Sequence, residues 1–138
     1  LSHTSELEVL PMSKEDLLKN SDVISIHVVF GDRYKNLITK NELNMMKKTS
    51  FLINTSRGKI INENDLVQAL KDESIAGVGL DVFDQEPLPT EHPLRNLPNV
   101  LISPHLGGRT RENFIARYDD CVENVLGWLK QKPVRLLT

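Results

Sequence analysis

Ionisable side chains that could bind an anion and move a proton occur at three separate places in the chain. Arg57 follows an apolar stretch in F-L-I-N-T-S-R-G, Glu86 precedes a proline in D-V-F-D-Q-E-P, and His105 lies in S-P-H-L-G-G. A guanidinium can bind a carboxylate through two charge-assisted hydrogen bonds, and a histidine exchanges protons near neutral pH. Glu86 beside His105 would favour the charged imidazolium. Together the three side chains could hold a small acid and perform acid–base chemistry on it.

Each of these residues also has an ordinary structural interpretation when it is taken alone. Arg57 could be a surface charge, Glu86 a solvated loop carboxylate, and His105 a hydrogen-bonded structural histidine. The functional interpretation therefore depends on whether the fold brings the three together.

Other polar or glycine positions are more ambiguous. Asp81 could simply end a strand, and Gly107 and Gly108 could form a turn or let the backbone approach a flat ligand closely. His3 and His92 are interpreted as surface loop residues and are assigned no role.

The elements that must position these residues alternate between helix and strand patterns. Capping residues at Ser13, Thr39, Asn62 or Asn64, and Thr110 predict four helix starts. Short stretches rich in β-branched residues predict four strands. The predicted helices lie within 13–20, 39–48, 62–71 and 110–130, and the predicted strands lie within 22–29, 50–55, 76–82 and 99–103.

This alternation predicts an α/β fold, a Rossmann-like parallel sheet with helices on both faces, present here as a partial dinucleotide-binding domain. In such sheets ligands bind at the carboxyl ends of the strands. Arg57 and His105 follow predicted strands, while Asp81 ends one and Glu86 lies in the loop after it. We therefore expect Arg57, Glu86 and His105 to converge at one edge of the sheet.

The helix predicted for 110–130 is amphipathic. Its apolar residues recur at spacings of three and four and would share one face, namely Phe114, Tyr118, Cys121, Val122, Val125 and Leu129. Such a face could bind a partner, but core packing is the favoured interpretation.

Composition excludes several functional classes. The chain has 138 residues and a net charge of -2, whereas a nucleic-acid grip usually leaves a basic footprint. No apolar run approaches the roughly 18 residues needed to span a bilayer, so no membrane partner is expected. The single Cys121 fits a reducing compartment such as the cytoplasm. No metal site is predicted, and the start at Leu1 suggests a piece of a longer protein.

The nucleotide-binding fingerprint G-x-G-x-x-G is not found. Gly77 and Gly79 form the only G-x-G, with Val82 in place of the third glycine, and they lie inside a predicted strand. We expect these two glycines to let a helix pack closely.

Four motifs in order resemble the nicotinamide-dependent D-isomer-specific 2-hydroxyacid dehydrogenases. They are S-D-V-I-S-I-H-V-V, L-I-N-T-S-R-G-K-I-I-N-E-N-D-L, I-A-G-V-G-L-D-V-F-D-Q-E-P-L-P and N-V-L-I-S-P-H-L-G-G-R-T-R-E, and the similarity runs from about residue 13 to 134. One departure is His27-Val28-Val29, where the family often has H-V-P.

The resemblance implies a role for each matching residue. Arg57 would bind the substrate carboxylate and polarise the keto oxygen, while Glu86 and His105 would form the acid–base pair. Asp81 would contact the nicotinamide carboxamide, and Val28 would approach the adenosine. The residues implied to contact the cofactor are Val28, Thr55, Ser56, Arg57, Asp81, His105, Gly107 and Gly108.

The resemblance also implies an oxidoreductase that transfers a hydride between NAD(P)H and a 2-keto acid, and a homodimer. NAD is the expected cofactor and NADP is not excluded. Residues 1–109 would be the rear part of the cofactor domain, and 110–138 a helix returning toward a substrate domain. The glycine-rich unit would lie upstream of Leu1, so the isolated chain is expected to be inactive.

Two other functions remain open at this level. An NAD(H)-sensing corepressor-like protein would keep the same three residues while acting as a scaffold. A formate or phosphite dehydrogenase would share the fold, although formate dehydrogenases usually carry glutamine where this chain has Glu86.

Overall fold

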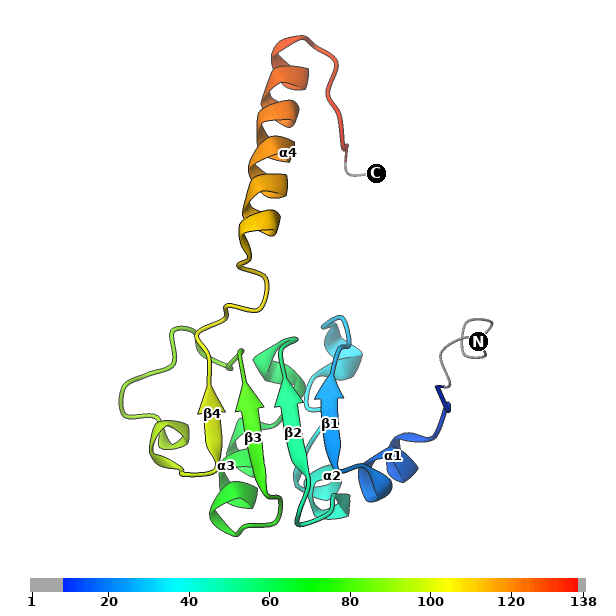
Figure 1. The fold of residues 1–138 in the computed structure, drawn as a ribbon, viewed down its shortest axis with the longest axis vertical. Helices are drawn as coiled ribbons and strands as arrows, with labels where there is room; N and C mark the ends of the chain where they lie inside the picture. Colours follow the sequence, from blue (N-terminus) through cyan, green and yellow to red (C-terminus); the bar gives the residue numbers. More distant parts are fainter. Residues whose placement is uncertain (1–8, 137–138) are drawn as a thin grey trace. The chain divides into compact units, whose positions relative to one another are not determined.

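The computed structural model describes residues 9–136. They form two compact units, and the first unit ends at His105. The first unit holds a parallel sheet of four strands in the order β1-β2-β3-β4 (Figure 1). The strands are β1 (Val23–Ile26), β2 (Phe51–Asn54), β3 (Gly77–Leu80) and β4 (Val100–Ile102). Helices α1 (Lys14–Asn20), α2 (Lys40–Met45) and α3 (Glu63–Lys71) alternate with them. The predicted Rossmann-like α/β fold is confirmed.

The strand register explains which side chains are buried. Ile24, Leu52 and Val78 are in-register partners on neighbouring strands, and all three are buried. Because side chains alternate along a strand, the residues between them point to the opposite face. There Val23, Phe51 and Leu101 are exposed. The core therefore lies on one face of this sheet, where it includes the fully buried helix residues Leu18, Leu43, Leu66 and Leu70. Within the described residues of the first unit the helices thus pack on one face only, whereas helices on both faces were expected.

Within the described residues the two glycines of β3 face neighbouring strands and no helix, so the expected reason for them was wrong there. A Cβ on Gly77 would lie 2.7 Å from the Asn99 carbonyl oxygen and 3.2 Å from the Phe51 ring. A Cβ on Gly79 would lie 3.0 Å from Cδ1 of Ile53. Gly77 therefore makes room for the Asn99 backbone and the Phe51 ring, and Gly79 makes room for the Ile53 side chain.

The predicted capping residues start their helices as expected. The Ser13 hydroxyl accepts a hydrogen bond from the Asp16 amide, and Thr39 forms a full capping box with Glu42. Of the two asparagines considered for α3, Asn62 is the cap and accepts from the Asp65 amide. These local bonds satisfy amides that have no partner inside the helix.

Glu42 connects its capping box to α1 and should make stability depend on acidity. Its carboxylate accepts from the Thr39 amide at 3.0 Å and from Lys14 Nζ at 2.9 Å. Burial alone would raise the pKa of Glu42, but the bonds from Thr39 and Lys14 outweigh it and lower the pKa from 4.5 to about 2. A lowered pKa stabilises the fold above pH 4.5, and this contribution is lost as the pH falls toward 2.

We therefore expect the wild-type chain to lose more unfolding free energy between pH 4.5 and 2 than a Glu42→Gln variant does. Denaturant unfolding at a series of pH values measures this difference. Glu15→Gln is the matched control, because Glu15 is exposed and lies 4.0 Å from its Lys19 partner. Equal pH slopes for wild type and Glu42→Gln would contradict the assignment.

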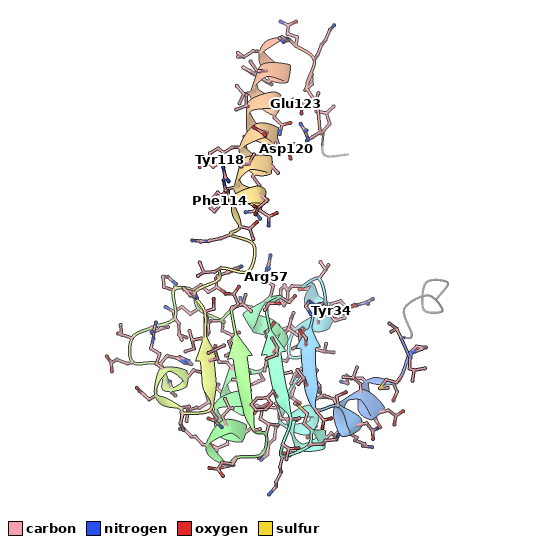
Figure 2. All side chains as sticks on the ribbon, viewed as in Figure 1. Tyr34, Arg57, Phe114, Tyr118, Asp120 and Glu123 are labelled. Atoms are coloured by element: carbon pink, nitrogen blue, oxygen red, sulfur yellow. The ribbon has the colours of Figure 1, made fainter. Side chains whose placement is uncertain are left out.

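The second unit consists of α4 (Arg111–Leu129) and the segment that follows it. Thr110 caps α4 as predicted. Arg135 pairs with Asp120 at 2.7 Å and with Glu123 at 2.5 Å, both labelled on α4 in Figure 2. The return segment thus reaches a polar side of the helix.

No side chain of α4 is buried, so the favoured expectation of core packing was wrong within the described residues. The apolar pattern is real, and Phe114 stacks on Tyr118 with ring centroids 6.4 Å apart. However, the segment that follows α4 pairs with acidic residues of the helix through Arg135. The role predicted for 110–138, a helix returning toward a substrate domain, stays a prediction.

None of the helices within residues 9–136 combines the length and apolar character needed to cross a membrane.

Candidate active site

The loop after β2 is held by a buried asparagine, the first residue of N-T-S-R-G. Asn54 is 1% exposed. Its Nδ2 donates to the Arg57 carbonyl oxygen at 2.9 Å, and its Oδ1 accepts from the Ser56 amide at 3.0 Å. Both ends of one side chain thereby fix the four-residue turn that carries Arg57. Sequence reasoning missed this role, although a polar residue ending an apolar strand signals such a turn.

Arg57 lies beyond the carboxyl ends of the strands (Figure 2). Its side chain is exposed, and Nη1 donates to the Ser56 carbonyl oxygen at 2.6 Å. A guanidinium has five N–H donors in a planar fork, so this one bond orients the group and leaves donors for an anion.

The backbone at Gly58, the residue after Arg57, lies so close to another loop that no side chain fits there. A Cβ there would lie 2.1 Å from the carbonyl carbon of Phe83 and 2.5 Å from the amide nitrogen of Asp84. No side chain fits in this space, so the backbone of the arginine loop packs directly on the peptide between Phe83 and Asp84.

We expect Gly58→Ala to destabilise the fold by about 1–3 kcal/mol, the usual cost of forcing extra atoms into a packed site. Gly31→Ala is the matched control, because a Cβ at Gly31 would meet nothing within 4 Å. Denaturant unfolding of both variants measures the difference. Similar unfolding free energies for Gly58→Ala and Gly31→Ala would mean that the Phe83–Asp84 peptide can move away without loss of stability.

Glu86 and His105 form a short hydrogen bond. Glu86 Oε2 lies 2.6 Å from His105 Nδ1, and Glu86 Oε1 accepts from the Phe83 amide at 3.0 Å. Burial alone would raise the pKa of Glu86, but the bonds from His105 and Phe83 and the charge of Arg57 outweigh it, so the pKa is lowered. Glu86 is therefore the ionised partner that faces the imidazole.

The three predicted catalytic residues line one groove of about 310 Å³. Arg57 comes from the loop after β2, Glu86 from the loop after β3, and His105 from the residues after β4. The apolar side chains of Phe30 and Phe83 line the same groove. The fold thus gathers at one place an anion-binding fork, a proton-exchanging ring and the carboxylate that orients it.

A second groove of about 450 Å³ adjoins the first, and Phe30 and Arg57 line both. Its other lining residues are His27, Val28, Val29, Thr55 and Ser56. The Ser56 hydroxyl donates to the Val28 carbonyl oxygen at 2.5 Å, so it fixes the shape of this wall. Apolar side chains beside the Thr55 hydroxyl suit a flat ring that carries a polar group, as nicotinamide does.

The roles predicted for Asp81, Gly107 and Gly108 as cofactor contacts stay predictions. Asp81 is 6% exposed and follows β3, where its amide donates to the Asn54 carbonyl oxygen, but it lines neither groove. Gly107 and Gly108 belong to the second unit, so their place beside a nicotinamide stays a prediction. Within residues 9–136 no three His, Cys, Asp or Glu side chains are grouped as metal ligands would be.

His92 is not a plain surface residue, contrary to the expectation. Its side chain is 18% exposed, and Nε2 lies 3.0 Å from Glu63 Oε1. Its Nδ1 accepts from the Leu94 amide at the start of a short 3-10 helix, Pro93–Asn96. Glu63 and His92 lie far apart in sequence, which is why no local pattern revealed the pair. His3 lies outside the described residues.

Comparison with known proteins identifies the family. Residues 2–107 match the model of the D-isomer specific 2-hydroxyacid dehydrogenase, NAD binding domain. The chain belongs to this family. A glyoxylate reductase of Aeropyrum pernix is 42% identical over 120 residues, which are 87% of this chain and 36% of that protein. The family and the predicted NAD cofactor class are thereby confirmed.

Solved structures of the family share the fold. A D-lactate dehydrogenase from Sporolactobacillus is 32% identical with a TM-score of 0.86, over 98% of this chain and 44% of that one. A formate dehydrogenase from Granulicella is 31% identical with a TM-score of 0.88, over 96% of this chain and 35% of that one. This family member spans 36% of the curated glyoxylate reductase that it matches.

Proposed function

We propose that this chain is the catalytic part of the cofactor domain in an NAD-dependent enzyme that reduces small 2-keto acids to D-2-hydroxy acids. The observation that carries this proposal is the shared groove of Arg57 with the hydrogen-bonded Glu86 and His105. The name of the Aeropyrum pernix relative, glyoxylate reductase, supports a small 2-keto acid as the substrate.

Arg57 binds the substrate carboxylate. Its guanidinium is exposed in the groove, and the bond from Nη1 to the Ser56 carbonyl oxygen holds the fork in place. The remaining N–H groups can pair with both carboxylate oxygens and also polarise the neighbouring keto oxygen. The positive charge of Arg57 stabilises the keto oxygen as it becomes negative during reduction. Arg57 therefore contributes both to substrate binding and to the reaction rate.

His105 donates the proton that the reduced oxygen needs. Glu86 accepts at Nδ1, which leaves Nε2 as the ring nitrogen that faces the substrate. The ionised Glu86 stabilises the imidazolium before the proton leaves, and the Phe83 amide holds Glu86 in position. In the reverse direction the neutral His105 takes the hydroxyl proton as a base.

The adjoining groove would hold the nicotinamide end of the cofactor. Val28, Thr55 and Ser56 line it, and Arg57 stands where the two grooves join. When bound, NADH supplies the hydride that reduces the carbonyl carbon. The chain's own contribution is to offer apolar side chains to the nicotinamide ring and to hold the substrate beside this groove.

Binding of oxamate tests the site without a reaction, because oxamate carries a carboxylate next to a carbonyl but is not reduced. We expect calorimetry with the full-length enzyme and NADH to show oxamate binding that Arg57→Ala abolishes. The proposal would be wrong if oxamate bound equally well to both proteins, since the carboxylate would then have another partner.

Three finer properties remain predictions. A homodimer follows from the family resemblance, and a cytoplasmic location from the single cysteine, Cys121. NADP also stays open as the cofactor, and an acyclic imino acid reductase with bound NADPH is 31% identical to this chain.

A further inference from the structure

The peptide between Phe83 and Asp84 is held from several sides. Gly58 packs against it so closely that a Cβ would lie 2.1 Å from the Phe83 carbonyl carbon. The Phe83 amide donates to Glu86 Oε1 at 3.0 Å. The next amide, that of Asp84, donates to Glu63 Oε2 at 3.3 Å. Two carboxylates therefore hold adjacent amides of one loop, and only one of them, Glu86, belongs to the catalytic pair.

Glu63 is itself held by His92. The side chains are 20% and 18% exposed, and Glu63 Oε1 lies 3.0 Å from His92 Nε2. Since His92 Nδ1 accepts from the Leu94 amide, the neutral ring must carry its proton on Nε2, where it donates to Glu63. Glu63 thus spans α3 and two points of the loop between β3 and β4, the loop that also carries Glu86.

The charge of Glu63 also acts on the side chain of Asp84, whose amide it accepts from. Partial burial raises the pKa of Asp84, and the negative charge of Glu63 raises it further. Lys59, Lys35 and His92 oppose this effect.

We propose that Glu63 is a positioning residue for the catalytic pair. Together with Gly58 it fixes the Phe83–Asp84 peptide, and the Phe83 amide then fixes Glu86, which orients the imidazole of His105. His92 holds Glu63 in the required rotamer. This inference rests on the proposed function for its effect on rate, but the positioning itself is a property of the chain.

The test is Glu63→Gln in the full-length enzyme, because glutamine has the size of glutamate but only one acceptor oxygen. It cannot accept from both the Asp84 amide and His92. We expect kcat for glyoxylate reduction to fall about 10- to 10²-fold with little change in KM, since small misplacements of reacting groups cost that much. Backbone amide exchange at Phe83 and Asp84 should become roughly 2- to 10-fold faster as a hydrogen bond is lost.

Two further variants make the result specific. Glu91→Gln makes the same change at an exposed position of the same loop and should alter neither readout. His92→Asn keeps an acceptor suited to the Leu94 amide but removes the bond to Glu63, and should act in the same direction as Glu63→Gln. It also replaces Glu63→Gln as the test if that variant does not fold.

Opposite outcomes overturn the inference. If Glu63→Gln lowers only the unfolding temperature and leaves kcat and exchange at Phe83 and Asp84 unchanged, Glu63 is merely structural. If the wild-type enzyme reduces no 2-keto acid, the proposed function fails. The exchange rates at Phe83 and Asp84 then still decide whether Glu63 positions the loop.

Discussion

Replacing His105 with glutamine is expected to lower kcat for 2-keto acid reduction about 10²- to 10⁴-fold, the usual contribution of general acid–base catalysis. Glutamine can still donate to Glu86, but its amide cannot release a proton to the reduced oxygen. The measurement is kcat of the full-length enzyme at saturating NADH and glyoxylate.

The fold itself should survive this change. The His105 side chain is 43% exposed and its φ is 54°, so glutamine removes no buried contact and occupies a backbone region that a non-glycine residue already occupies there. An unchanged unfolding temperature is therefore the control. A variant with near-normal turnover would show that the proton comes from elsewhere and that the Glu86 bond only holds a structural histidine.

Arg57→Ala is expected to lower kcat/KM about 10²- to 10⁴-fold, through both a higher KM and a lower kcat. Each charge-assisted hydrogen bond contributes roughly 1.5–3 kcal/mol, and a fork makes two of them. The KM effect reflects the lost carboxylate contact, whereas the kcat effect reflects lost polarisation of the keto oxygen. Steady-state kinetics with varied glyoxylate separates the two.

Arg57→Lys is the companion variant, because it keeps the charge and removes the planar fork. We expect it to recover only part of the lost kcat/KM. If Arg57→Ala changed cofactor affinity alone, the carboxylate assignment would be wrong, and Arg57 would belong only to the adjoining groove.

Much of the fold, and the grouping of Arg57, Glu86 and His105, could be predicted from the sequence because helix caps and strand ends are local sequence signals. The caps at Ser13 and Thr39 act within four residues of chain. Parallel strands present their carboxyl ends at one edge, so residues that follow the strands meet there. That rule placed Arg57 and His105 in one groove.

The parts that could not be predicted depend on contacts between residues distant in sequence. The need for glycine at position 58 comes from a peptide that begins 25 residues later, at Phe83. The position of the Glu63 side chain depends on His92, which lies 29 residues later. The apolar face of α4 could be predicted, but what packs against it could not, because periodicity identifies an apolar face and not its partner.

The most direct test follows NADH consumption by the full-length enzyme supplied with glyoxylate, beside a second reaction that contains formate and NAD⁺. We predict that glyoxylate drives NADH oxidation, that formate reduces no NAD⁺, and that Arg57→Ala and His105→Gln each suppress the first reaction. Formate oxidation without glyoxylate reduction, or no reaction with any 2-keto acid, would contradict the assignment of Arg57, Glu86 and His105 to carbonyl reduction.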